Sequence, residues 1–296
     1  GVVIGESLNE YMPLIASKGV RQTPWSEGQN VRQLEPMGFI KFDILGLSTL
    51  RMIEDCIEKI LRRHHGITNP TFEDIKKFYD AHLHPDQIDL DDQAVYENIF
   101  HKGKWVGIFQ FTENGAQTFA KQVKPRSIID ISAITSIYRP GPLSAGVDRE
   151  FVEAHNSPEN VKYINDLVQE VTEETHGFLI FQEQIAMLAH KLGRNLTLDE
   201  GNLLRKVLTK KGTGKGHEVK DAIHEKFVLG CQDKGMPLWQ AEELWKTFEY
   251  FSGYGFNKSH AVSYSIISYQ CAWLCHYYAT EWVASFLDKE PESRKE

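Results

Sequence analysis

The sequence predicts a mainly α-helical fold, in which a small α/β segment at the N-terminus leads into a large all-helical region. Short apolar runs separated by polar residues, typical of strands, occupy residues 1 to about 47. From Ser48 onward the apolar residues recur at helical spacing, and prolines and glycines separate the helices. This change of period is the main reason for placing helices after strands.

The composition supports a folded chain. Of the 296 residues, 41% are hydrophobic and 11% aromatic, which is enough for a sizeable core in one or two domains and excludes global disorder. The 41 acidic residues outnumber the 33 Lys and Arg. A net negative charge argues mildly against a nucleic-acid binder unless the cations are clustered.

The first elements can be placed by their patterns. Residues 1–4 and 39–45 read as strands, and a helix follows from Ser48 to Gly66, which closes it. Residues 67–105 are polar and irregular, and we expect a connecting segment with short helices. The apolar face predicted for the helix consists of Leu50, Ile53, Ile57, Ile60 and Leu61.

Helices dominate from Thr112 to the C-terminus. Arg139-Pro140-Gly141-Pro142 is expected to break the chain, because two prolines and a glycine cannot continue a helix. Thr197 and Glu200 form a capping box before another helix. A second break at residues 252–255 precedes a long helix from about Asn257 to Tyr278. Gly193 is expected to end a helix whose apolar face includes Ile180, Ile185, Leu188 and Leu192.

Cysteines and apolar stretches indicate the compartment. No pair of the four cysteines has the spacing of a zinc site or a secreted disulfide framework, so we expect buried, reduced thiols in a cytoplasmic protein. Residues 261–279 are interrupted by Gln270, His276 and serines, which predicts a buried helix and no membrane span. Because Gly1 begins inside an apolar run, we interpret the chain as a piece of a longer protein. The four cysteines are Cys56, Cys231, Cys271 and Cys275.

Lys41 and Asp43 form the first candidate site. In a strand they point to one face, with Phe42 opposite. A carboxylate on an apolar strand is costly to bury unless a metal ion or Lys41 pairs with it. A structural ion pair at a sheet edge explains the same pattern.

Cations gather between Arg205 and Lys226. Arg205 and Lys206 lie mid-helix, and residues 210–216 form a basic turn interleaved with glycines, which can bring N–H and ammonium groups against phosphate. The turn lacks the strand and the ending of a Walker A loop. A solvated loop is the alternative to phosphate or DNA contact through Lys210, Lys211 and Lys215.

Residues 253–260 are the most informative stretch. Glycines on both sides of Tyr254 allow close backbone approach, and the helix that follows begins with Asn257, Lys258 and His260. A helix N-terminus that carries a lysine is an anion site. This favours a functional site over a simple capped turn.

The paired histidines are expected at the surface. His64 with His65, and His82 with His84, have no carboxylate or cysteine at a metal-site spacing.

Taken in order, these motifs resemble the catalytic alpha subunit of bacterial DNA polymerase III, the C-family replicative polymerases. Residues 1–4 resemble the strand entering the end of the palm, and residues 39–47 resemble the palm strand with the third catalytic aspartate. Four later segments resemble successive parts of the fingers: residues 108–111, 139–143, 181–184 and 253–260. The resemblance implies a palm remnant at residues 1–60 and helical fingers at residues 61–296.

The resemblance implies roles for individual residues. Asp43 resembles the third metal-binding carboxylate, with Lys41 as a cation that faces the triphosphate. Arg205 resembles the first of two consecutive fingers arginines, and Lys206 stands in the second place, where lysine keeps the charge but loses bidentate geometry. The other implied contacts are Asn257 and Lys258 to the nucleotide, His260 to the sugar, and Arg139 to DNA or phosphate.

The family's other two aspartates belong to an Asp-x-Asp pair before the start of this chain. The resemblance therefore implies part of a DNA-directed DNA polymerase that uses two Mg²⁺ ions, primer–template DNA and deoxynucleoside triphosphates, and is inactive without the upstream palm. Its remaining partners would be the rest of the polymerase and a sliding clamp. We expect the protein in the bacterial cytoplasm, encoded by the bacterium or by a phage. Two alternatives stay open: an inactive helical module that binds a protein, and a nucleotide- or nucleic-acid-binding regulator.

Overall fold

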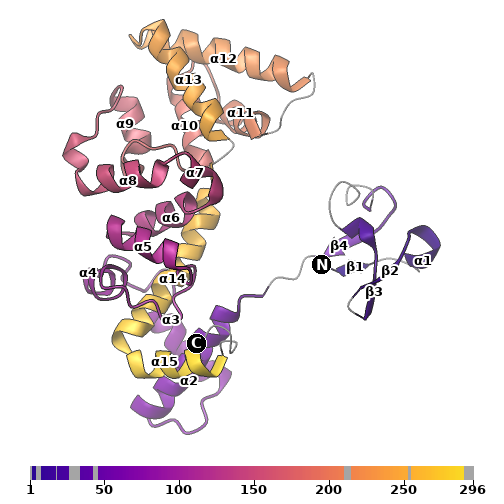
Figure 1. Cartoon of the computed structure of the whole chain (residues 1–296), viewed down its shortest axis with the longest axis vertical. Coiled ribbons are helices and arrows are strands. Elements are labelled where there is room, and N and C mark those ends of the chain that lie inside the picture. The colour runs from indigo at the N-terminus through magenta and orange to yellow at the C-terminus, as the bar shows by residue number, and fades with distance from the viewer. Residues whose placement is uncertain are drawn as a thin grey trace. The chain divides into compact units, whose positions relative to one another are not determined.

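The structure is a computed structural model of the chain and describes residues 2–4, 8–17, 19–26, 34–42, 46–209, 215–252 and 255–289. The chain forms two compact units, Gly1–Ser48 and Thr49–Glu296. Strands occur in the first unit and helices make up the second, so the predicted mainly helical fold is confirmed (Figure 1). The boundary predicted at residue 60 falls inside a helix, and as a palm–fingers boundary it stays a prediction.

Two small antiparallel sheets form the first unit. Strand β1 (Val2–Ile4) pairs with β4 (Ile40–Phe42), and β2 (Ile15–Ser17) pairs with β3 (Val20–Gln22). The strands predicted in residues 1–4 and 39–45 are thus found where the structure describes these residues. The unit also contains the helix α1 (Leu8–Tyr11) and the 3₁₀ turn η1 (Pro24–Ser26), around a core of Met12, Leu34 and Phe39.

Strand β4 carries Lys41 opposite Val3 of β1. Ile40 and Phe42 point to the other face of the strand and are 58% and 47% exposed. An apolar face of β4 is therefore exposed in the described part of the first unit.

Helices and short turns make up the second unit. In chain order they are α2 (Ser48–His64), α3 (Phe72–His82), α4 (Gln93–Val95), the π-helical turn η3 (Tyr96–His101), α5 (Asn114–Val123), α6 (Ile128–Ile137), α7 (Pro140–Ser144), α8 (Val147–Asn156), η4 (Pro158–Asn160), α9 (Asp166–Thr172), η5 (Glu173–Thr175), α10 (Gln182–Leu192), α11 (Leu198–Thr209), α12 (Lys215–Asp233), α13 (Leu238–Ser252), α14 (Lys258–Tyr277) and α15 (Ala279–Lys289).

Helix α2 follows the predicted pattern with one correction. Its buried stripe includes Ile53, Ile57, Ile60 and Leu61, but Leu50 is 49% exposed. Met52 and Cys56 take the place of Leu50 on the buried face, because they lie three or four residues from the other buried positions. Gly66 has a φ of +68°, and beside it the N–H of Ile67 donates to the carbonyl of Leu61, as in a glycine-terminated helix.

Helix α14 runs from the middle of the second unit toward the end that contains α2 and α15 (Figure 1). It packs against α6, where the hydroxyls of Ser132 and Ser265 lie 3.0 Å apart. Gln270 is buried and donates to the carbonyl of Leu83 at 2.7 Å, which satisfies a polar group inside the core. Residues 261–279 thus belong to a buried helix, and no helix in the described ranges is long and apolar enough to cross a membrane.

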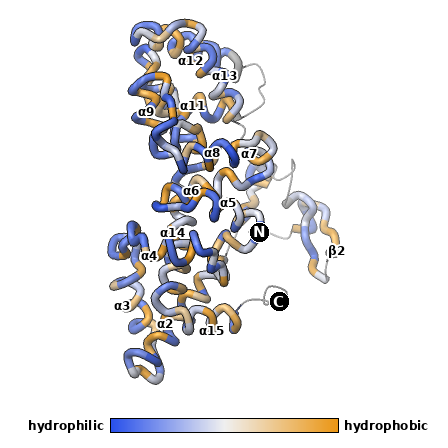
Figure 2. Tube along the Cα trace, turned by 60° about the vertical axis from the view of Figure 1, so that its left-hand side comes forward, coloured by the Kyte–Doolittle hydropathy of each residue, from blue (hydrophilic) through white to orange (hydrophobic). Residues whose placement is uncertain are grey.

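The second unit has two apolar cores. One gathers α2, η3, α5, α6 and α14, and the other gathers α9 to α13. Figure 2 shows hydrophobic and hydrophilic residues alternating along these helices, as expected where one face of each helix is buried. In the second core α11 crosses α10 closely, since a Cβ on Gly201 would lie 2.4 Å from the Ala186 carbonyl oxygen. The predicted capping box is present, because Glu200 accepts the Thr197 N–H and Thr197 Oγ1 accepts the Glu200 N–H.

One further prediction about helices is confirmed, and one needs correction. The Pro-Gly-Pro segment separates α6 from α7 as predicted, but Pro140 begins helix α7 and Pro142 lies within it. A proline fits the first turn of a helix, where its missing N–H has no partner to lose. Ile180 is buried but precedes α10, so it is not part of that helical face.

The four cysteines are buried and unpaired, as predicted. Burial raises the pKa of all four thiols, to about 11 for Cys231 and about 12 for Cys271. They are therefore protonated and unreactive at neutral pH.

Of the paired histidines, His64 has a carboxylate partner that its sequence neighbours did not reveal. Its Nε2 lies 3.1 Å from Glu281, on α15.

Candidate functional site

The start of α14 is capped by Asn257. Its Oδ1 accepts the backbone N–H of His260 at 2.8 Å, which satisfies one of the free N–H groups of the first turn. Lys258 is the first residue of the helix, and His260 lies in the same turn.

A backbone bridge ties this helix start to α10. Phe181 and Phe256 form an isolated parallel bridge, in which the Phe256 N–H donates to the Ile180 carbonyl at 3.0 Å and the Gln182 N–H donates to the Phe256 carbonyl at 2.9 Å. The side chain of Gln182 adds a hydrogen bond from Nε2 to the Gly255 carbonyl. The first turns of α10 and α14 are thus held together, although they are far apart in the sequence.

Glu183 occupies the anion position of α14. One of its carboxylate oxygens accepts the Lys258 backbone N–H at 2.9 Å, and the other accepts the Asn257 side-chain amide at 3.0 Å. The positive end of the helix dipole favours a carboxylate here. The sequence predicted an anion site at this helix start but did not identify Glu183 as the anion within the chain.

The ammonium group of Lys258 pairs with Glu174. Its Nζ lies 2.7 Å from both carboxylate oxygens of Glu174 and 5.7 Å from the centre of the Phe181 ring. Both side chains of the ion pair are about one-third exposed. An ion pair at such a site is worth little net stability, so an incoming anion can compete with it.

Arg205 reaches the same place from α11. It donates to the Gln182 side-chain oxygen at 3.0 Å and lies 3.7 Å from Glu183 Oε1. Lys206 is exposed on α11 and points about 100° away around the helix axis, so the two neighbours do not act as a matched pair.

Arg139 and His260 flank the Phe256 ring. The Arg139 guanidinium lies 4.6 Å from the ring centre, and its Nε donates to the Ser136 carbonyl. Burial lowers the pKa of Arg139, but an arginine stays charged at neutral pH. The His260 ring meets Phe256 edge-on and lies 4.1 Å from the ring of Tyr264.

A cavity of about 530 Å³ opens beside Lys258. Besides apolar atoms, its lining carries carboxylates from Glu170, Glu173, Glu174 and Glu183, and ammonium groups from Lys191 and Lys258. Each ammonium group pairs with a glutamate, Lys191 with Glu170 and Lys258 with Glu174. The site is therefore not simply basic: its cations are held by carboxylates that a stronger anion must displace.

The structure thus brings together Arg139, Arg205, Asn257, Lys258 and His260 around the Phe181–Phe256 bridge. Lys41 lies in the other compact unit. Asp43, Lys210 and Lys211 lie outside the described residues, and Lys215 begins α12 with a side chain that also lies outside them. The arrangement at α14 suits binding of a phosphate-bearing ligand with an aromatic or sugar portion against Phe256 and His260.

Comparisons with known proteins all identify DNA polymerase III alpha subunits as similar to this chain. Residues 49–235 match the family described as bacterial DNA polymerase III alpha subunit finger domain. DNA polymerase III subunit alpha of Campylobacter jejuni is 33% identical over 98% of this chain, and that of Aquifex aeolicus is 33% identical over the whole of this chain. The Thermus aquaticus subunit is 32% identical over 98% of the chain. These matches cover 22%, 23% and 22% of the three relatives, so the chain spans less than a quarter of their length.

Proposed function

Because the chain belongs to the bacterial DNA polymerase III alpha subunit family and contains its finger domain, we propose that it binds the incoming deoxynucleoside triphosphate of a DNA polymerase. The observation that carries this proposal is the convergence of Lys258, Asn257 and Arg205 on the N-terminus of α14. The polymerase activity belongs to a longer protein or assembly that includes primer–template DNA and the upstream palm. We place that assembly in the bacterial cytoplasm, with a sliding clamp as a further partner.

In this proposal the triphosphate displaces two carboxylates. It takes the place of Glu183 at the Lys258 N–H and the place of Glu174 at the Lys258 ammonium. Arg205 neutralises further phosphate charge from α11, and Lys206 supplies a more distant cation. Arg139, with Lys210, Lys211 and Lys215, contacts DNA or phosphate.

His260 is proposed to sense the sugar. Its ring is held between Phe256 and Tyr264, in the first turn of α14 and two residues after Lys258. An imidazole fixed in this way can exclude a ribose 2′ hydroxyl by its bulk.

The reaction proposed is attack of the primer 3′ hydroxyl on the α-phosphate, with release of pyrophosphate. Two Mg²⁺ ions would supply activation of the hydroxyl and charge stabilisation. Asp43 is proposed as one of three carboxylates that hold them, beside Lys41, and the other two would come from an upstream Asp-x-Asp. The support for Asp43 is its place in the sequence, directly after β4. The uncovered Ile40–Phe42 face is where we expect the rest of the palm to pack.

One observation favours a second candidate. Lys258 and Arg205 are both close to carboxylates, as they would be in an inactive helical module whose charges serve only its own structure. Such a module would bind no triphosphate.

The test is deoxynucleotide binding by the chain alone and by the chain joined to an upstream palm segment with an Asp-x-Asp pair. The palm-containing form is expected to bind triphosphate in a Lys258-dependent way and to extend primers, while the chain alone shows no extension. Triphosphate binding that is absent in both forms would support the inactive module. Robust Mg²⁺-dependent extension by the chain alone would contradict the division of carboxylates proposed here.

A further inference from the structure

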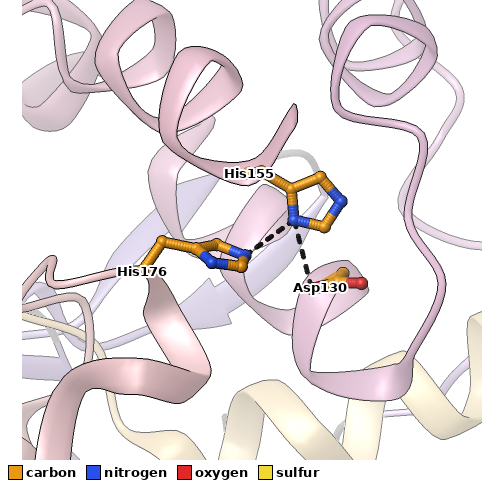
Figure 3. A group of neighbouring side chains, drawn as sticks. All are labelled: Asp130, His155 and His176. Carbon is orange, nitrogen blue, oxygen red and sulfur yellow. Dashed lines mark hydrogen bonds and ion pairs between the residues drawn. The ribbon is translucent and has the colours of Figure 1, made fainter. Parts of the chain in front are cut away.

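Three potential metal ligands meet outside the set of contacts described at the start of α14, although His176 is only two residues from Glu174, the partner of Lys258. Asp130 lies in the first turn of α6, His155 in the last turn of α8, and His176 directly after η5 (Figure 3). One ligand atom from each residue lies within 4.8 Å of the other two. Among the described residues this is the only such group of three, and sequence spacing gave no sign of it.

The spacing of these atoms is close to that of a coordination shell. His155 Nδ1 lies 2.8 Å from His176 Nε2 and 3.6 Å from Asp130 Oδ1 (Figure 3). Ligands bonded to Zn²⁺ at about 2.0–2.2 Å in a tetrahedral arrangement lie about 3.3 Å apart. These two distances fall on either side of this value, and the third separation, between His176 and Asp130, is no more than 4.8 Å.

Hydrogen bonding alone leaves the cluster unsatisfied. His155 is 4% exposed, and its Nε2 makes no hydrogen bond of normal geometry. An ion bound at Nδ1 would place the proton of His155 on Nε2, the nitrogen that is available as a donor.

Asp130 accepts the backbone N–H of Arg126 through Oδ2, which leaves Oδ1 turned toward His155.

The two imidazoles are fixed before any ion binds. The Phe151 ring stacks on His155 and packs against His176, with ring centres 6.0 and 5.7 Å apart. His176 has a φ of +54°, in the left-handed region, where Asn, Asp and His are the most frequent residues other than glycine. This backbone conformation belongs to the turn that brings His176 to the cluster.

His176 also borders a cavity of about 260 Å³ that Glu150 and Glu153 line. An acidic cavity provides an entry path for a cation and room for a water as a fourth ligand.

We propose that Asp130, His155 and His176 bind one divalent transition-metal ion, with Zn²⁺ as the ion that fits this set of two nitrogens and one oxygen. Magnesium prefers oxygen ligands, so this site is distinct from the Mg²⁺ site proposed at Asp43. The ion would fasten the end of α8 to the turn after η5 and to the start of α6, which makes its role structural.

The test is titration of the metal-free full chain with Zn²⁺, in competition with a coloured chelator, and with Co²⁺ as a spectroscopic probe. We expect one Zn²⁺ per chain, a higher Tm with Zn²⁺, and visible Co²⁺ bands of nitrogen–oxygen coordination. His176→Asn keeps a residue that tolerates the left-handed backbone, and Asp130→Asn keeps the shape of the side chain. Each is expected to weaken Zn²⁺ binding at least about tenfold and to abolish the rise in Tm.

His224→Gln is the matched control, because His224 also lies 3.1 Å from a carboxylate, that of Glu242, but outside any cluster of three. It should leave Zn²⁺ affinity unchanged. Circular dichroism of each metal-free variant verifies that it is folded. The proposal is overturned if the wild-type chain binds no Zn²⁺, if folded His176→Asn and Asp130→Asn bind it as tightly as wild type, or if equimolar Mg²⁺ displaces it.

Discussion

Glu183 accepts the backbone N–H of Lys258 at 2.9 Å, although the two residues are 75 positions apart in the chain. A carboxylate from α10 thus fills the anion site at the start of α14. The proposed triphosphate must remove it to bind.

Replacing Glu183 by Gln is expected to strengthen triphosphate binding. The amide keeps a hydrogen-bond acceptor for the helix start but no longer competes as an anion, which is worth roughly 0.3–1 kcal/mol, or about a threefold gain in affinity. Calorimetric titration of the palm-containing protein with a deoxynucleoside triphosphate measures this affinity. Glu170→Gln is the control, because Glu170 lines the same cavity but pairs with Lys191. Equal affinity of Glu183→Gln and wild type would show that the triphosphate does not use this helix end.

Lys258→Met should have the opposite effect. It removes the ammonium group that is proposed to leave the Glu174 carboxylate and pair with a phosphate. Triphosphate affinity should therefore fall at least about tenfold, or about 1.4 kcal/mol. The same titration applies, with Lys191→Met as a control for loss of one cation from the cavity. Equal losses in the two variants would point to a general field effect rather than a contact by Lys258.

His260→Ala tests the sugar proposal. With a methyl group in place of the imidazole, ribonucleotide incorporation relative to deoxynucleotide should rise about tenfold or more, roughly 1.4 kcal/mol of lost discrimination. Competition between matched ribo- and deoxynucleoside triphosphates in the active polymerase measures the ratio. Ser259→Ala, at the exposed neighbouring position, should leave the ratio unchanged. If both incorporation rates fall equally in His260→Ala, the residue packs the site and does not select the sugar.

Asp43→Asn tests the catalytic carboxylate. Removing its charge from the active polymerase should slow primer extension at least about a hundredfold, because metal-assisted charge stabilisation is lost. Extension under single-turnover conditions measures the chemical step, and a thermal melt verifies the fold. Normal extension would assign Asp43 to a structural ion pair with Lys41.

The lowered pKa of Asp55 implies that the stability of the fold depends on pH. Burial acts to raise the pKa of Asp55, but Lys59, through its hydrogen bond and charge, together with Ser285 and Lys289 outweighs it, so the pKa is lowered. A carboxylate with a lowered folded-state pKa stabilises the fold above its unfolded pKa of about 3.9 and loses this contribution as pH falls through the folded value. Asp55→Asn should therefore destabilise the chain at pH 7, by an amount that shrinks as pH falls below about 4.

Urea unfolding at pH 7, 5 and 3 checks this difference. Asp80→Asn is the control, since Asp80 pairs with Lys76 on the exposed face of α3. A destabilisation by Asp55→Asn that stays constant down to pH 3 would mean that lost packing, rather than lost charge, is responsible.

Local signals in the sequence predicted local structure well. The glycine end of α2, the capping box at Thr197 and the start of α14 each depend on residues within a few positions of one another. A single residue can also carry two local signals. Pro140 ends the preceding helix as predicted and also begins α7, because proline is favourable at the first helical position.

The candidate sites were predicted only in part. The cations at Arg205 and Lys258 were recognisable because the fingers motifs contain them. Their partners were not, because the contacts of Lys258 with Glu174 and Glu183 join segments that only the tertiary fold brings together. The same holds for Asp130, His155 and His176, which come from three separate elements with no spacing pattern between them.

The bridge between Phe181 and Phe256 has a mechanical consequence. Because backbone hydrogen bonds join the first turns of α10 and α14, a swing of either helix must carry the other with it. Glu183 and Lys258 would then move together as one rigid unit, and the distance between them would not change. A ligand at this place must part them by a rotation of the glutamate side chain, which is a fast local event and needs no slow rearrangement of helices.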